Sequence, residues 1–167
     1  MKPAVAAIAA LIASAATAAP TVTEADFVSK DFGFSDGKTL PALKQHYRTI
    51  GTPVRNAKGE IINAVMVGHG TGGTGAQFLV PQFARLLEPG GTLDAGKYFI
   101  ILPDAIGHGG SSKPSDGLKM GFPAYDYADM VRAQGQLLDH LGVKQLRLLM
   151  GTSMGCMMGF QFGIDLP

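Results

Sequence analysis

Apolar and polar positions recur with two different periods along the chain, and these periods predict strands and helices in turn. Residues 44–49 alternate well enough to form a strand, after a polar connecting segment. Three short runs at 64–68, 98–102 and 145–150 are apolar on both faces. Strands of that composition are typical of a parallel sheet that helices cover on both sides.

Longer segments with a period of three to four residues predict the helices. Residues 77–87 place apolar side chains on one face, residues 125–141 carry the strongest amphipathic pattern and end at Gly142, and a further helix begins at Met154. Strands and helices therefore alternate, which implies right-handed βαβ crossovers. The predicted fold class is α/β, with a mainly parallel sheet and helices on both faces.

The first 18 residues have the pattern of a secretory signal peptide. Lys2 precedes an apolar run at 4–13, and small residues follow up to Ala18, where cleavage is expected. A membrane anchor is the alternative, but the run is shorter than the ~20 residues that span a bilayer. We therefore expect an exported protein, periplasmic or secreted, without stable membrane insertion, whose residues 19–167 form one partial domain.

Charge and cysteine content exclude several classes of partner. The chain has 14 basic and 13 acidic residues and no block of like charge, so neither nucleic acid nor an anionic membrane surface is expected as a partner. Cys156 is the single cysteine, which excludes an intramolecular disulfide, and we expect a small buried residue rather than a reactive thiol. The four histidines lack partners at metal-ligand spacing, so no metal is expected.

The pentapeptide GTSMG at 151–155 is the strongest candidate for catalysis. It follows an apolar strand and opens a helix, which is the setting of a nucleophile elbow. Such a turn projects a serine hydroxyl clear of the backbone and crowds the positions two before and two after it, where this chain has Gly151 and Gly155. We therefore predict that Ser153 is the nucleophile of an acyl-transfer reaction. A glycine-flanked turn that serves only helix packing is the alternative.

Two backbone amides are needed to stabilise the oxyanion that forms when the serine attacks a carbonyl. The N–H of Met154, at the start of the new helix, is one predicted donor. The glycine-rich loop at 69–73 follows an earlier strand and is expected to supply the second, from Thr71 or else from Gly72. His69 is expected to brace this loop rather than to react.

The same loop has a rival interpretation, because GHGTGG at 68–73 also fits the dinucleotide-binding pattern G-x-G-x-x-G between a strand and a helix. That pattern needs an acidic residue at the end of a strand about 20 residues further on. Asp104 lies about 30 residues further on and is expected to brace its own loop. Nicotinamide cofactors are also scarce outside the cytoplasm, so no cofactor is expected.

These residues resemble the α/β-hydrolase superfamily, and within it the homoserine O-acetyltransferases and their exported hydrolase-like relatives. The resemblance runs from about Tyr47 to the end of the chain and is strongest in DMVRAQ at 129–134, LDHLG at 138–142 and GTSMGC at 151–156. Residues 104–112 also resemble the D-x-x-G-x-G-x-S loop of the superfamily.

The resemblance implies that Ser153 is acylated by an ester or thioester, and that the acyl group then passes to water or to an alcohol. Because export separates the protein from acetyl-CoA, we expect hydrolysis of a small-molecule acyl substrate. Acylation of homoserine is the alternative chemistry.

The order of catalytic residues in the superfamily raises a further expectation. There the nucleophile is followed by an acid and then a histidine, but only Asp165 follows Ser153 in this chain. We therefore expect the chain to be the N-terminal part of the enzyme, truncated after the elbow, poorly soluble and inactive by itself. An inactive truncated paralogue or a binding module is the alternative. Homo-oligomerisation is left open.

Overall fold

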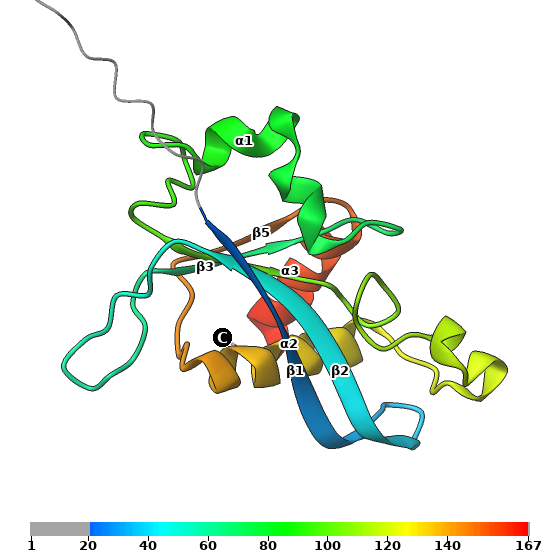
Figure 1. The fold of residues 1–167 in the computed structure, drawn as a ribbon. Coiled ribbons are helices and arrows are strands. Elements are labelled where there is room, and N and C mark those ends of the chain that lie inside the picture. The colour runs from blue at the N-terminus through cyan, green and yellow to red at the C-terminus, as the bar shows by residue number, and fades with distance from the viewer. Residues whose placement is uncertain (1–20, 167) are drawn as a thin grey trace, which may run out of the picture.

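The structure, a computed structural model, describes residues 21–166. The predicted signal peptide at 1–18 and its cleavage near Ala18 lie outside the described residues. The described part of the chain is one sheet with helices on both of its faces (Figure 1). The predicted α/β class is therefore confirmed.

Five strands form a mixed sheet in the order β1-β2-β4-β3-β5. Strands β3, β4 and β5 run parallel, whereas β1 and β2 form an antiparallel hairpin that pairs with β4 through β2. The bounds are β1 (Val22–Gly33), β2 (Thr39–Ile50), β3 (Ala64–Gly68), β4 (Phe99–Pro103) and β5 (Leu148–Gly151). Because the three parallel strands share one direction, their carboxyl ends meet at one edge of the sheet.

Within residues 21–166, three α-helices and three short 3₁₀ helices lie between or after the strands. They are η1 (Gly75–Leu79), α1 (Pro81–Leu87), η2 (Pro114–Asp116), η3 (Lys119–Gly121), α2 (Tyr127–Leu141) and α3 (Met154–Asp165). Helix α1 covers one face of the sheet, and α2 and α3 pack together on the other (Figure 1).

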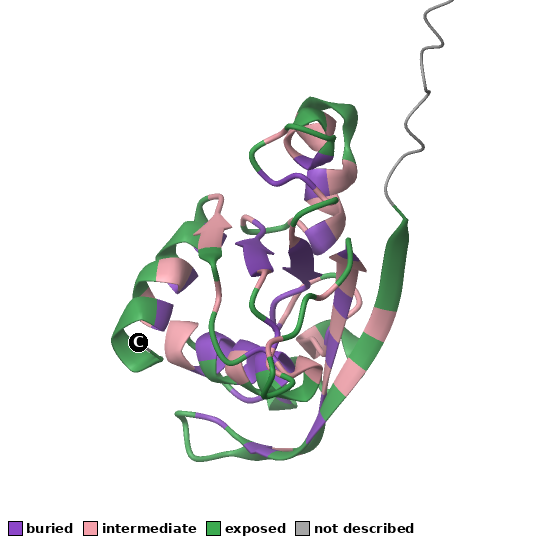
Figure 2. Ribbon diagram, turned by 90° about the vertical axis from the view of Figure 1, so that its left-hand side faces the viewer, coloured by how far each residue is buried: buried purple, intermediate pink, exposed green. Residues whose placement is uncertain are grey.

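Two clusters of buried side chains hold these helices to the sheet, because alternate residues of a strand point to opposite faces. One cluster joins β3 and β4 to η1 and α1, and it includes Val65, Val67, Ile100, Leu102, Phe78 and Leu87. The other joins the same strands to α2 and α3, and it includes Met66, Ile101, Val131, Met154, Met158 and Phe162. Buried residues accordingly concentrate in the central strands and on the inner sides of the helices (Figure 2).

Helix α2 matches its sequence prediction because both of its ends carry capping residues. The Asp126 carboxylate accepts a hydrogen bond from the Asp129 N–H, and Asp129 accepts one in return from the Asp126 N–H, which forms a capping box. Gly142 ends the helix in the left-handed conformation, with φ of 80°. The predicted amphipathic helix is therefore confirmed to within two residues at its start.

The prediction that a polar connecting segment precedes residue 44 is wrong, because this segment forms β1 and the start of β2. Strand β1 has 12 residues, of which only Ser29 and Phe32 are buried. Its ladder to β2 runs from Val22 opposite Ile50 to Gly33 opposite Thr39. Backbone pairing rather than a buried face defines this strand, so the segment lacks the hydrophobic alternation that predicts strands.

The helix predicted at 77–87 is interrupted, and the last strand is shorter than predicted. Val80 is extended between η1 and α1 because the ring of Pro81 disfavours the helical conformation of the residue before it. Strand β5 begins only at Leu148, where pairing with Val65 of β3 starts. Cys156 is exposed on α3, so its predicted burial is also wrong.

Candidate active site

The carboxyl ends of β3 and β5 bring together the two segments from which the sequence predicted a site. Gly68 and Gly151 are partners in the last register position of these parallel strands. The loop at 69–73 therefore begins beside the turn that carries Ser153. A Cβ atom built on Gly70 would lie 3.5 Å from the Cβ of Ser153, so the gap between the loop and the turn would hold about one added carbon atom.

Ser153 occupies a strained backbone conformation at the junction of β5 and α3. Its φ is 48° and its ψ is −113°, outside the regions that a residue with a side chain usually adopts. Such a conformation costs on the order of 1–3 kcal/mol and persists only where the surroundings impose it. The residue is exposed and its side chain does not cap α3. The hydroxyl therefore lies at the surface of a tight turn. This turn, at 151–155, and the adjacent loop at 69–73 together form what we call the corner.

Glycines at 151 and 155 impose this turn, because no Cβ would fit at either position, and a Cβ on the adjacent Gly68 would lie only 3.0 Å from the Gly155 Cα. A Cβ on Gly151 would lie 2.4 Å from the carbonyl carbon of Gly155, and a Cβ on Gly155 would lie 2.2 Å from the carbonyl oxygen of Gly68. Both distances are too short for any real Cβ contact. The Thr152 N–H also donates to the Gly68 carbonyl over 3.1 Å. Strand β3 and the start of α3 thus confine the turn from both sides.

The predicted oxyanion donors lie on either side of this contact. Met154 is the first residue of α3, and within residues 21–166 no hydrogen bond uses its N–H. Opposite it, the Gly73 N–H donates to the Gly70 carbonyl over 3.0 Å and closes a turn whose central residues are Thr71 and Gly72. Gly72 has a φ of 76°, which a turn of this kind requires at its third position. Both central residues are exposed, so their amides can reach a ligand.

His69 braces the loop, as predicted. Its side chain is buried, Nδ1 lies 2.8 Å from the Gly70 carbonyl oxygen, and Nε2 accepts a hydrogen bond of 3.0 Å from the Ala105 N–H. These contacts are those of a neutral imidazole that carries its proton on Nδ1. Burial lowers the pKa of His69 below 6.5 and nearby His108 lowers it further, whereas the bond to Gly70 and the charge of Asp104 oppose this shift.

Asp104 also braces its surroundings, as predicted, and it connects three segments. One carboxylate oxygen accepts from the Gly75 N–H over 2.7 Å and from Arg48 Nη1 over 3.1 Å. The other accepts from the Gly110 N–H over 2.8 Å. The carboxylate is fully buried, and Arg48 in β2 supplies its counter-charge. The loops after β3 and β4 are therefore fixed to each other through one side chain.

The sequence did not predict two residues of this region, Arg48 and Gln77. Arg48 lies in a strand without any motif, and Gln77 lies in the apolar-patterned segment that was predicted as a helix. The Gln77 side chain contacts both Gly70 and Thr152. The only sequence signal for either residue is a polar side chain next to buried positions, which is too common to single them out.

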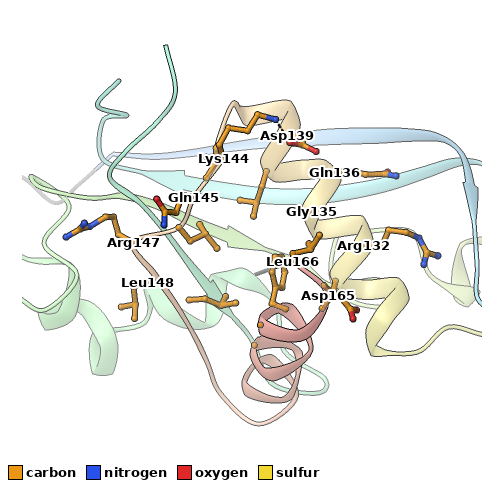
Figure 3. A pocket seen from close by; sticks show the side chains of 18 of the residues that line it. Arg132, Gly135, Gln136, Asp139, Lys144, Gln145, Arg147, Leu148, Asp165 and Leu166 are labelled. Carbon is orange, nitrogen blue, oxygen red and sulfur yellow. Dashed lines mark hydrogen bonds and ion pairs between the residues drawn. The ribbon is translucent and has the colours of Figure 1, made fainter. Parts of the chain in front are cut away.

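A groove lies between α2, β5 and α3 (Figure 3). Its volume is about 1230 Å³, and its lining includes Leu148 and Leu166 but neither Ser153 nor Thr71. The Lys144 ammonium group and the Asp139 carboxylate pair over 2.6 Å at its rim. The groove follows the free edge of β5 and contains none of the predicted site residues.

Asp165 lies beside this groove at the far end of α3. Twelve residues of helix separate it from Ser153, which corresponds to roughly 18 Å along the axis. Its carboxylate accepts a hydrogen bond of 2.9 Å from Gln161. This position agrees with the inference that Asp165 does not serve as the acid of a catalytic triad.

Metal binding and membrane insertion are two further kinds of function on which the described residues bear. Residues 21–166 contain no group of three or more His, Cys, Asp or Glu side chains that could hold a metal ion. In the same range, none of the helices is both long and apolar enough to cross a bilayer.

The fold and this corner agree with the family to which the sequence belongs. The chain matches the family described as alpha/beta hydrolase fold over residues 63–167, and it belongs to that family. The glycine-rich loop after β3 therefore lies within the part of the chain that matches the α/β-hydrolase family.

Individual relatives include both acyltransferases and a hydrolase. The chain is 36% identical over 143 residues to a protein of Methanothermobacter thermautotrophicus named "Probable acyltransferase". The aligned region covers 84% of this chain and 44% of that protein. It is 32% identical over 155 residues to a homoserine O-acetyltransferase of Geotalea daltonii, covering 82% and 41% respectively. Among solved structures, an acetylester hydrolase from Corynebacterium glutamicum superposes with a TM-score of 0.72 at 25% identity, covering 87% and 41%.

The chain spans less than half the length of each of these three proteins. The resemblance to homoserine O-acetyltransferases and their hydrolase-like relatives is confirmed over this N-terminal part. At the level of the family, the relatives are hydrolases and acyltransferases.

Proposed function

We propose that this protein is a serine-dependent acyl hydrolase that forms an acyl-enzyme at Ser153. The observation that carries the proposal is the backbone of Ser153, held at a φ of 48° by glycines at 68, 151 and 155. A purely structural turn gains nothing from such strain, whereas a nucleophile gains an accessible hydroxyl.

The proposed reaction has two halves. The Ser153 Oγ attacks the carbonyl carbon of an ester while a base takes its proton, and the Met154 and Thr71 amides stabilise the oxyanion, with Gly72 as the alternative to Thr71. The tetrahedral intermediate then expels an alcohol, which receives the proton from the base. Water next attacks the acyl-enzyme in the same way and releases the carboxylic acid.

His69 is unsuited to act as the base, because both of its ring nitrogens are engaged with Gly70 and Ala105. Protonation at Nε2 would also break the bond to the Ala105 N–H. We therefore assign proton transfer to a base other than His69.

Hydrolysis is preferred over acyl transfer on the basis of the export inferred from residues 1–18. An exported enzyme meets water in excess and little acetyl-CoA. The likeness to an acetylester hydrolase supports the same choice. Transfer of an acyl group to homoserine is the second candidate, and it is favoured by the two acyltransferases among the relatives.

A fluorophosphonate probe tests the serine mechanism in the full-length protein. We expect covalent labelling at Ser153 that Ser153→Ala abolishes, because the probe phosphonylates an activated serine hydroxyl. Ser115→Ala is the matched control, since Ser115 is an exposed serine of η2 outside the corner. A folded Ser153→Ala variant that is labelled like the wild type would refute the proposal.

Product analysis separates the two candidate reactions. The enzyme is supplied with an acetyl ester or acetyl-CoA, with and without homoserine, and the products are identified by mass spectrometry. Release of free acetate at the same rate in both cases supports hydrolysis. Formation of O-acetylhomoserine in place of acetate supports transfer.

A further inference from the structure

Gln77 is a polar residue that connects the two segments of the candidate active site. It lies in η1, four residues after Gly73. Its amide oxygen accepts from the Gly70 N–H over 3.4 Å, and its amide nitrogen donates to the Thr152 hydroxyl over 3.0 Å. One planar group therefore spans from the glycine-rich loop to the residue directly before Ser153.

The space around this amide is closely filled. A Cβ on Gly73 would lie 2.7 Å from the Gln77 amide oxygen, and a Cβ on Gly70 would lie 3.4 Å from the Thr152 hydroxyl oxygen. The absence of a side chain at Gly73 thus leaves room for the Gln77 amide in its present position.

We propose that Gln77 is a positioning residue that fixes the separation between the two oxyanion donors. The inference rests on the proposed acyl-enzyme function and extends it to a residue outside the reacting atoms. Thr71 directly follows Gly70, and Met154 lies two residues after Thr152. Gln77 thus holds both segments next to the amides that must converge on one oxygen.

Glycine content explains why such a residue is needed. The loop at 69–73 contains three glycines, which resist distortion less than other residues do. Donors have to lie within 2.7–3.1 Å of the oxyanion to stabilise it. His69 fixes the loop to the segment after β4, and Asp104 fixes the neighbouring start of η1 to the same segment. Gln77 connects the loop to the turn that carries the nucleophile through its hydrogen bond to Thr152.

The test compares isosteric variants on both sides of the contact. Gln77→Met keeps the length and loses both hydrogen bonds, Thr152→Val removes the hydroxyl, and Thr152→Ser retains it. Gln82→Met is the matched control, because Gln82 is an exposed glutamine of α1. The full chain is assayed for kcat and KM with p-nitrophenyl acetate, for fluorophosphonate labelling, and for hydrogen exchange of residues 69–77.

We expect Gln77→Met and Thr152→Val each to lower kcat and the labelling rate about tenfold, less than the 10²–10³ that removal of an entire donor costs. KM is expected to stay within about twofold, because the amide does not contact substrate. The double variant is expected to lose no more than either single variant, since both break the same contact. Thr152→Ser restores activity, and amide exchange at 69–77 accelerates only in the variants that lack the contact.

The outcomes separate this inference from the proposed function. Folded Gln77→Met protein with unchanged labelling and unchanged exchange overturns the positioning role, and so does a rise in KM at constant kcat. If the wild type is not labelled at Ser153 but exchange at 69–77 still accelerates in both variants, the contact stands and the serine mechanism fails.

Discussion

Two buried aspartates in this protein have nearly the same bonds and different consequences. Asp104 lies after β4 and accepts from Arg48 and from the backbone of two loops, at Gly75 and Gly110. Asp129 lies in α2, where it accepts from Arg132 and from the backbone and hydroxyl of Ser35 in the β1–β2 turn. Both carboxylates are at most 1% exposed.

The difference lies in what each aspartate connects. Asp129 connects a hairpin to a helix, two elements that regular hydrogen bonding already makes rigid. Asp104 connects the start of η1, next to the glycine-rich loop, to the loop that follows β4. The same chemistry therefore stabilises the fold at one place and shapes a site at the other, and the predictions below separate these two effects.

The largest effect is expected where the corner is most crowded. Gly155→Ala places a Cβ 2.2 Å from the Gly68 carbonyl oxygen, so the start of α3 has to move away from β3 together with the Met154 amide. We expect fluorophosphonate labelling of Ser153 to fall by about 100-fold or more, because misplacement by about 1 Å has that effect on a reacting pair.

Gly163→Ala on the same helix is the matched control. A Cβ at Gly163 meets nothing within 4 Å, so the substitution is expected to leave labelling unchanged and to raise the free energy of unfolding by up to about 1 kcal/mol. Normal labelling of Gly155→Ala would show that the corner tolerates displacement. The corner would then not differ in this respect from the hairpin junction, the contact between Asp129 of α2 and the β1–β2 turn.

Removal of the two aspartates compares the regions directly. Asp104→Ala removes one of the two carboxylates that pair with Arg48, which keeps Glu24, and it leaves the Gly75 and Gly110 amides without their acceptor. It is expected to cost about 3–5 kcal/mol of unfolding free energy. Asp129→Ala is expected to cost less, about 1–3 kcal/mol, because the Arg132 side chain is 44% exposed and can be solvated. Urea denaturation measures both losses.

Labelling per folded molecule gives the second readout of this pair. We expect Asp104→Ala to reduce it, because the loops after β3 and β4 lose their common anchor, and Asp129→Ala to leave it unchanged. Equal labelling in the two variants would mean that Asp104, like Asp129, serves stability alone.

The sequence predicts the corner better than it predicts the hairpin, and the reason is physical. The central strands are buried on both faces, and the elbow needs glycine at fixed spacing, so both leave a local signal in the residues. Strand β1 leaves none, because long-range pairing with β2 defines it while Glu24, Asp26 and Lys30 remain exposed. Predicting this strand would have required reading the Asp-Gly turn at 36–37 as the centre of a hairpin.

The pattern of apolar and polar residues also did not predict which side chains contact each other between distant segments. His69 and Asp104 were predicted to brace loops because they stand in motifs, but their partners could not be deduced. Gln77 contacts Thr152 across 75 positions of the sequence. Such pairs depend on how the loops pack, and periodicity carries no information about that packing.

The smallest of the expected effects is a pH dependence that arises from His69. Burial lowers the pKa of His69 below the ordinary 6.5, so the folded state binds the proton less readily than the unfolded state does. The unfolding free energy that this histidine contributes is therefore complete above about pH 6.5 and declines as the pH falls below it, by at most about 1.4 kcal/mol per pH unit. Labelling is expected to decline over the same range, since protonated Nε2 cannot accept the Ala105 N–H.

Urea denaturation at intervals between pH 7.5 and 5.0 measures this slope, and His69→Gln provides the comparison. The variant is expected to be less stable at pH 7.5 and to show a flatter profile, because the group that takes up the proton on unfolding is gone. Asp129→Ala, at the hairpin junction, should keep the wild-type slope, since His69 and its partners are untouched there. If the slope of unfolding free energy against pH is unchanged in His69→Gln, other groups cause the pH dependence. Protonation of His69 would then not distinguish the two regions.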